Sequence, residues 1–245
     1  VDVFQRFLTF FKSYRTESGS LKYREMIQRL PLTDEKSVVI DFNELLRFDP
    51  QLAKQITDRP EWLKQASDAI KDVVDLEDHE FVLKVLEKGA EFKARLRNLE
   101  EKVNLRMIRA IHIGKLIMVD GIVTRVSEVK PQLITAMFQC NCGQKQEVPQ
   151  VEGRYTPLTM CPACKRDGPF TLIAEDSRFV DWQKIRIQEM PEELPPGQMP
   201  RSIDVIVKED LVDAARPGDR VSIIGVLMSV QDFAPRRGRL TTFRT

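Results

Sequence analysis

Apolar residues in the first hundred positions recur at the spacing of α-helices. Every third or fourth residue is large and apolar in four stretches, as expected when one face of a helix is buried. These stretches are 4–11, 23–30, 63–74 and 81–86. One short β-type run, SVVID, lies between the second and the third. The pattern predicts a small helical bundle over residues 1–105.

After Ile113 the pattern changes to short β-type runs separated by Gly, Pro and Asp. The five runs are 115–129, 132–140, 179–189, 202–210 and 219–230. Five such strands fit a small closed barrel of the oligonucleotide-binding (OB) type, although the strand count also allows a sandwich. We predict an OB-fold β-barrel built from residues 106–139 and 172–245. The fold class is therefore α+β and multidomain.

Composition limits the function classes. A length of 245 residues favours two or three cores over one. No apolar run approaches the ~20 residues of a membrane span, and charges interrupt the aromatic start of the chain, which argues against a signal peptide. We expect a soluble, intracellular protein without a membrane partner. The net charge is only +1 although 31% of residues are charged, so any anion-binding surface must be local.

All four cysteines lie close together in the sequence. Cys140 and Cys142 form a C-x-C pair, and Cys161 and Cys164 form a C-x2-C pair, with 18 residues between the pairs. Four thiolates complete a closed tetrahedral zinc shell that leaves no position for a reactive water. The spacing predicts one structural zinc ion per chain, in a zinc-binding lobe of residues 140–171 inserted into the barrel. Zinc would supply folding free energy to a segment with few large apolar residues.

Two other states of the cysteines stay open. They could form two disulfides or be unrelated thiols in a core. Disulfides are disfavoured in a chain without a secretory signal. The C-x-C pair is one residue shorter than the usual C-x2-C turn.

No catalytic residues are predicted. The stretch IHIGKLIM contains Gly-Lys, but a phosphate-binding P-loop needs glycine where Arg109 stands and Ser or Thr where Leu116 stands. The cysteines are assigned to metal, and with two histidines a Ser/His/acid arrangement has little support. We therefore expect that this chain is not an enzyme.

Two stretches carry candidate contacts to nucleic acid. In one strand Trp182, Lys184 and Arg186 alternate onto one face, which would set cations beside an aromatic ring able to stack a base. The alternative is that Trp182 packs under the lobe and the arginines pair with carboxylates. We expect the arginines of the barrel strands to be uncompensated and therefore to meet phosphate.

The second stretch, SVQDFAPRRGRLTTF, predicts a strand, a turn and a strand. The turn carries Arg236, Arg237 and Arg239 and no acidic residue. A solvated basic tail is the alternative.

The sequence resembles the amino-terminal half of an archaeal minichromosome maintenance (MCM) replicative helicase. KLIMVDGIVTRVSEVKP, the cysteine insert and KIRIQEMPEELPPGQMPRSIDVIVKEDLVDAARPGDRVSIIGVLMSV carry the resemblance. The helical stretch DFNELLRFDPQLAKQITDRPEWLKQASDAI is similar to the leading helical subdomain of that family. The resemblance covers essentially the whole chain.

The resemblance implies a homo-hexameric ring, or a double hexamer, that encircles single- and double-stranded DNA, with other replication proteins as further partners. It implies a cytoplasmic, nucleoid-associated protein of an archaeal cell. In this family an ATPase module that binds ATP and Mg²⁺ follows the amino-terminal half. The chain stops at Thr245, where that module would begin. We interpret it as part of a longer ATP-dependent DNA helicase.

Particular residues match positions of the family. Arg125, Arg186 and Arg201 match barrel positions that contact a single strand, and the basic turn matches a hairpin that points into the central channel. The proline-rich loop EMPEELPPGQMPRS matches a loop that communicates with the ATPase tier, although a plain surface connection is the alternative. Two other functions stay open: a stand-alone single-strand-binding protein with an OB barrel and zinc, and a zinc-bearing adaptor for protein partners.

Overall fold

The computed structural model describes residues 2–87, 89–150, 155–230 and 242–244. Contacts divide the chain into two compact units. One comprises Val1–Thr124, Arg186–Val205 and Pro217–Thr245, and the other comprises Arg125–Ile185 and Ile206–Arg216. The predicted division into helical bundle, barrel and cysteine lobe stays a prediction, because this grouping follows compactness alone.

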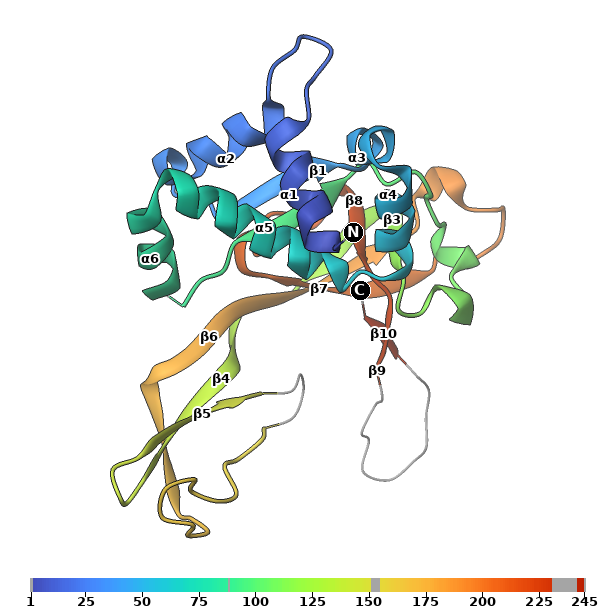
Figure 1. The fold of residues 1–245 in the computed structure, drawn as a ribbon. Helices are drawn as coiled ribbons and strands as arrows, with labels where there is room; N and C mark the ends of the chain where they lie inside the picture. The colour runs from blue at the N-terminus through green and yellow to red at the C-terminus, as the bar shows by residue number, and fades with distance from the viewer. Residues whose placement is uncertain (1, 88, 151–154, 231–241, 245) are drawn as a thin grey trace. The chain divides into compact units, whose positions relative to one another are not determined.

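The four predicted helices are confirmed in the first unit (Figure 1). They are α1 (Val3–Ser13), α2 (Lys22–Thr33), α5 (Trp62–Glu77) and α6 (His79–Glu87). Two short helices that periodicity did not reveal, α3 (Phe42–Phe48) and α4 (Pro50–Asp58), lie between α2 and α5. Both begin after an aspartate, Asp41 or Asp49, whose carboxylate accepts a hydrogen bond from a backbone N–H of the first turn.

Aromatic side chains form the centre of the helical core. Phe7, Phe10 and Phe11 of α1 are fully buried, as is Tyr23 of α2. The rings of Phe10 and Phe11 pack against Tyr23, and Phe7 stacks on Phe11. The run SVVID is strand β1 (Ser37–Asp41), which pairs in parallel with β2 (Lys93–Arg97). The helices and this two-stranded sheet share one core.

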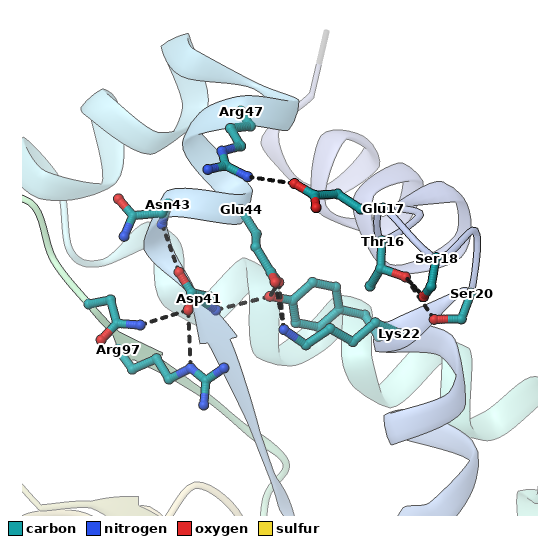
Figure 2. A network of polar contacts seen from close by, with 12 residues as sticks. Thr16, Glu17, Ser18, Ser20, Lys22, Asp41, Asn43, Glu44, Arg47 and Arg97 are labelled. Atoms are coloured by element: carbon teal, nitrogen blue, oxygen red, sulfur yellow. Dashed lines mark hydrogen bonds and ion pairs between the residues drawn. The ribbon is translucent and has the colours of Figure 1, made fainter.

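A polar network ties α2 to β1 and α3 inside this core (Figure 2). The hydroxyl of Tyr23 donates to Glu44 at 2.5 Å and accepts the backbone N–H of Asp41 at 3.0 Å. Lys22 also donates to Glu44, at 2.7 Å. Burial and the hydrogen bond to Glu44 raise the pKa of Tyr23 above its ordinary value, so the hydroxyl keeps its proton.

Replacing Tyr23 with phenylalanine should lower the free energy of unfolding by about 1–2 kcal/mol, because it leaves the Asp41 N–H without its acceptor. Tyr14→Phe is the matched control, since its ring lies in the same aromatic cluster and its hydroxyl has no hydrogen bond among the described residues. Urea unfolding measures both variants. Equal losses would show that the network does not stabilise the core.

Among the described residues, the other strands form one hydrogen-bonded sheet of eight strands, where the sequence had predicted five runs and one more strand after the basic turn. The strands are β3 (Leu116–Val126), β4 (Lys130–Cys140), β5 (Lys145–Pro149), β6 (Phe170–Gln188), β7 (Ser202–Lys208), β8 (Arg220–Val226), β9 (Met228–Val230) and β10 (Thr242–Arg244). Their order is β5-β4-β6-β7-β10-β9, and β3 pairs with β6 and β8. Two strands were not predicted separately: the last predicted run divides at Leu227 into β8 and β9, and β5 lies within the predicted cysteine lobe.

Two local features position the functional residues. A Cβ atom at Gly121 of β3 would lie 2.6 Å from the carbonyl oxygen of Gln188 in β6, so only glycine allows this approach of the two strands. In the described parts of the chain, four short 3-10 turns occupy the connections: Leu105–Met107, Ala110–His112, Pro191–Glu193 and Glu209–Leu211.

Among the described residues, no helix is long and apolar enough to cross a membrane.

Candidate metal centre and nucleic-acid interface

The first cysteine pair lies in a tight turn at the end of β4. The N–H of Cys140 donates to the carbonyl of Gln144 at 2.9 Å, and the Cys140 carbonyl accepts the N–H of Gly143 at 2.8 Å. Gly143 has a φ of +88°, in the left-handed region that favours glycine. The glycine that follows CNC therefore lets this short pair turn back on itself.

The second pair uses a similar turn. The N–H of Cys161 donates to the carbonyl of Arg166, and its carbonyl accepts the N–H of Lys165, both at 3.0 Å. Lys165 takes the left-handed conformation here, with a φ of 59°. Each cysteine pair is thus held by backbone hydrogen bonds of its own turn.

The two turns bring all four sulfur atoms together, within 4.8 Å of one another. The Sγ atoms of Cys140 and Cys164 are 3.6 Å apart, and those of Cys142 and Cys161 are 3.7 Å apart. A disulfide requires about 2.05 Å, whereas thiolates about 2.3 Å from a tetrahedral metal are separated by roughly 3.8 Å. The four cysteines are free and could hold a metal ion.

The surroundings of the sulfur atoms differ. Cys140 and Cys161 are buried, while Cys142 is exposed. The backbone N–H of Cys164, with that of Ala163, outweighs burial and lowers the pKa of Cys161 to about 6. At Cys140 the backbone N–H of Cys142 lowers the pKa of the thiol. Burial and hydrogen bonds with the other thiols outweigh this effect and raise the pKa to about 11. The lowered pKa favours the thiolate of Cys161, the form that binds metal.

The alternation predicted for β6 is confirmed. Gln183, Ile185 and Ile187 are buried, whereas the side chains between them are exposed or half-buried. Trp182 and Lys184 are half-buried, and Arg186 is exposed. Backbone hydrogen bonds to Ser127 hold Lys184 in this arrangement. The strand thus presents an aromatic residue and two cations on its outer face.

The expectation that Arg186 is uncompensated is wrong. Its guanidinium donates to both carboxylate oxygens of Asp204, at 2.7 and 3.1 Å. Asp204 is buried, and its side chain is 7% exposed, while that of Arg186 is 48% exposed. The alternative, an arginine paired with a carboxylate, describes this residue. The pairing raises the pKa of Arg186 above its ordinary value.

Arg125 and Arg201 differ from Arg186. Arg125 is exposed and has no hydrogen bond or ion pair within the described part of the chain. Arg201 is exposed, and its Nη1 reaches only the carbonyl oxygen of Arg106, at 3.5 Å, among the described residues. Both positive charges therefore lack a carboxylate partner in those parts of the structure.

Within the first unit, the proline-rich loop is bound by cations that the sequence analysis did not single out. Arg106 Nε donates to Glu189, a carboxylate 6% exposed, at 2.9 Å, and Nη2 donates to the carbonyl of Met199 at 3.0 Å. Lys102 pairs with Glu193 at 3.2 Å, and Arg220 pairs with Glu192 at 2.5 Å. For Lys102 and Arg106 the signal in the sequence was the run of cations in KVNLRMIRAIHIGK, which has no acidic residue; nothing in the sequence marked Arg220.

The strands that flank the basic turn pair as predicted. β9 and β10 are antiparallel, with Val230 opposite Thr242 and Met228 opposite Arg244. Arg236, Arg237 and Arg239, predicted at the tip, lie outside the described residues.

Comparisons with known proteins match nearly the whole chain. Residues 4–108 match the family model "MCM N-terminal domain", and residues 104–231 match "MCM OB domain".

Curated relatives agree with these matches. The chain is 37% identical over 250 residues to "Minichromosome maintenance protein MCM" of Saccharolobus solfataricus, covering 99% of this chain and 35% of that protein. It is 33% identical to "DNA replication licensing factor MCM6" of Arabidopsis thaliana, covering 93% of this chain and 28% of that protein. For "DNA replication licensing factor MCM2" of Oryza sativa subsp. japonica the identity is 31%, covering 91% of this chain and 23% of that protein. The chain spans about a third of the length of these relatives or less.

Proposed function

Because this chain belongs to the MCM family, of which it has the N-terminal and OB domains, we propose that it is the DNA-binding and ring-forming part of a replicative helicase. The observation that carries the proposal is the OB match over residues 104–231, since this class of domain binds oligonucleotides along its strands. The exposed cations described above lie on strands or loops of that domain. Neither a stand-alone single-strand-binding protein nor a protein adaptor is favoured by the family match.

The DNA contacts that we propose divide into two groups. Arg125, Lys184, Arg186 and Arg201 contact a single strand, with Trp182 available to stack a base. Arg236, Arg237 and Arg239 contact the backbone of a duplex that passes through the ring. Arg186 would contact the single strand while its Nε and Nη2 remain bound to Asp204, so that the rest of the guanidinium is left for phosphate.

The cysteine centre has a structural part in this proposal. Cys140, Cys142, Cys161 and Cys164 bind one zinc ion per chain, because four sulfur donors at these separations suit a closed tetrahedral site. The ion stabilises the lobe and takes no part in catalysis.

The assembly that we propose is a homo-hexamer or double hexamer around DNA. ATP and Mg²⁺ bind, and unwinding occurs, in the ATPase module of the full-length helicase. The proline-rich loop, which Arg106 holds through Glu189, communicates between this part of the protein and the ATPase module. The protein acts on the nucleoid in the cytoplasm of an archaeal cell, where other replication proteins are further partners.

Three measurements test the proposal: native mass, DNA binding and ATP hydrolysis. Native mass analysis of the chain should give a hexamer or its double, and labelled single-stranded and duplex DNA should both bind, with log affinity falling steeply as log salt concentration rises. The chain alone should not hydrolyse ATP. A monomer that binds no DNA, or DNA-stimulated ATP turnover by the pure chain, would contradict the proposal.

A further inference from the structure

The segment that enters the sheet carries one cation without an acidic partner. Lys102 pairs with Asp120 at 2.8 Å, Arg106 with Glu189 at 2.9 Å, and Lys115 with Asp58 at 3.2 Å. Arg109 lies between the last two cations, is exposed, and has no carboxylate partner among the described residues. Its charge is therefore not neutralised within those parts of the chain.

Arg109 is held close to a second arginine in the same condition. Its Nη1 donates to the carbonyl oxygen of Arg106 at 2.7 Å and to that of Ile108 at 2.8 Å. Nη1 of Arg201 donates to the same Arg106 oxygen at 3.5 Å. The two Nη1 atoms are therefore no farther apart than the sum of their distances to that oxygen. Two like charges at this separation repel each other, and an anion that contacts both offsets this repulsion.

The surrounding structure keeps both arginines in place. The side chain of Arg106, whose carbonyl they share, is fixed to the buried carboxylate of Glu189. That carboxylate also accepts the backbone N–H of Arg201 at 2.9 Å, and the N–H of Glu189 donates to the Arg201 carbonyl at 3.0 Å. The carboxylate of Glu189, which accepts the backbone N–H of Arg201, is thus already paired with Arg106. The pair Arg109 and Arg201 carries two positive charges that this carboxylate does not balance.

The guanidinium groups still have donors to offer. Arginine has five N–H groups, and Arg109 uses only those of Nη1, so Nε and Nη2 have no acceptor among the described residues. Arg201 uses one N–H in the same way. An edge formed by Nε and Nη2 matches two phosphate oxygens.

We propose that Arg109 is a further DNA-binding residue, which together with Arg201 forms a two-arginine site for a phosphodiester group of the bound strand. This inference rests on the proposed function, since the phosphate is that of DNA. It adds a residue from the connection between the 3-10 turns to the contacts proposed for the strands. Because the ligand is a backbone phosphate, the site positions DNA and does not read its sequence.

Binding of labelled single-stranded DNA over a series of salt concentrations tests the site. Arg109→Ala should weaken binding roughly tenfold, the scale of one lost charge-assisted hydrogen bond, and should reduce the salt slope by about 0.7 for each chain in contact with DNA. Arg109→Lys should keep the slope and lose part of the affinity, because lysine cannot bind two oxygens in the same plane. The matched control is Arg29→Ala, which removes the same charge from an exposed position on α2.

A double variant tests whether one phosphate is shared. If Arg109 and Arg201 hold the same group, Arg109→Ala with Arg201→Ala should weaken binding by less than the product of the two single effects. Thermal unfolding of each variant accompanies these assays, since Arg109 also binds two backbone carbonyls. Arg109→Lys keeps the test valid if the alanine variant does not fold.

The possible failures are distinct. Wild-type protein that binds DNA, together with an Arg109→Ala variant whose affinity and salt slope equal those of Arg29→Ala, would overturn this inference and leave the proposed function standing. Stabilisation by inorganic phosphate that depends on Arg109, without any effect of Arg109 on DNA binding, would also overturn it. Wild-type protein that binds no DNA would contradict the proposed function itself.

Discussion

Replacing Cys161 with serine should reduce bound zinc from one equivalent per chain to well below half, and should unfold the cysteine lobe. Cys161 is fully buried, and backbone N–H groups lower the pKa of its thiol, whereas a serine hydroxyl keeps its proton at neutral pH and offers zinc no thiolate. Structural zinc supplies roughly 10–16 kcal/mol of binding free energy in small zinc-dependent folds. A lobe with few buried apolar residues cannot stay folded without this contribution. Metal analysis and limited proteolysis measure the two effects, and native mass should show weaker assembly.

Asn141→Ser is the matched control for this change. Asn141 is exposed, lies between two of the cysteines and offers no sulfur. It should keep the full metal content and the protease resistance of the wild type. Full zinc content in the Cys161 variant, or an equal loss in the Asn141 variant, would rule out the four-cysteine site.

Changing Arg236, Arg237 and Arg239 together to alanine should weaken DNA binding about equally for all sequences and flatten its salt dependence. Each lost phosphate contact removes about 0.9 from the slope of log affinity against log salt on duplex DNA, and a ring multiplies this loss by the number of chains in contact. If these arginines face the proposed central channel and not a subunit boundary, the native mass should not change. Titration of labelled duplex at several salt concentrations provides the measurement.

Arg125→Ala gives the contrast for the tail variant. It should impair single-strand binding more than duplex binding, since Arg125 is assigned to the strand face of the OB domain. An unchanged duplex salt slope in the tail variant would eliminate the channel assignment and favour a solvated tail.

Helix prediction succeeded where burial imposes a long periodic pattern. α5 has 16 residues and buries Ala66, Ile70 and Val73 on one face, which the sequence displays directly. α3 and α4 have 7 and 9 residues, too few for a clear period, and only the family resemblance indicated them. Strand β2 was missed because KARLR offers just two apolar residues among three cations.

The cysteine cluster was predictable because each pair of ligands is only one or two residues apart in the sequence. Two local turns are therefore enough to bring the four sulfur atoms together. The pairing of the arginines was not. Arg186 meets Asp204 at a separation of 18 residues, and Arg106 meets Glu189 at a separation of 83. Such partners are chosen by the way the strands fold together, which local patterns do not specify. The same reason explains why Arg109 drew attention only as a failed P-loop position.

The close contact at Gly121 limits which substitutions this protein can accept. Any side chain at this position would meet a backbone carbonyl, which cannot rotate away as the end of a side chain can. The strand that would have to move carries Arg186 two residues before Gln188, and Glu189 follows directly after it. A change from glycine to alanine in β3, conservative by any scale of residue similarity, would therefore shift residues of the proposed DNA-binding surface without altering one of them. Tolerance to mutation around this surface is set in part by a residue that has no side chain.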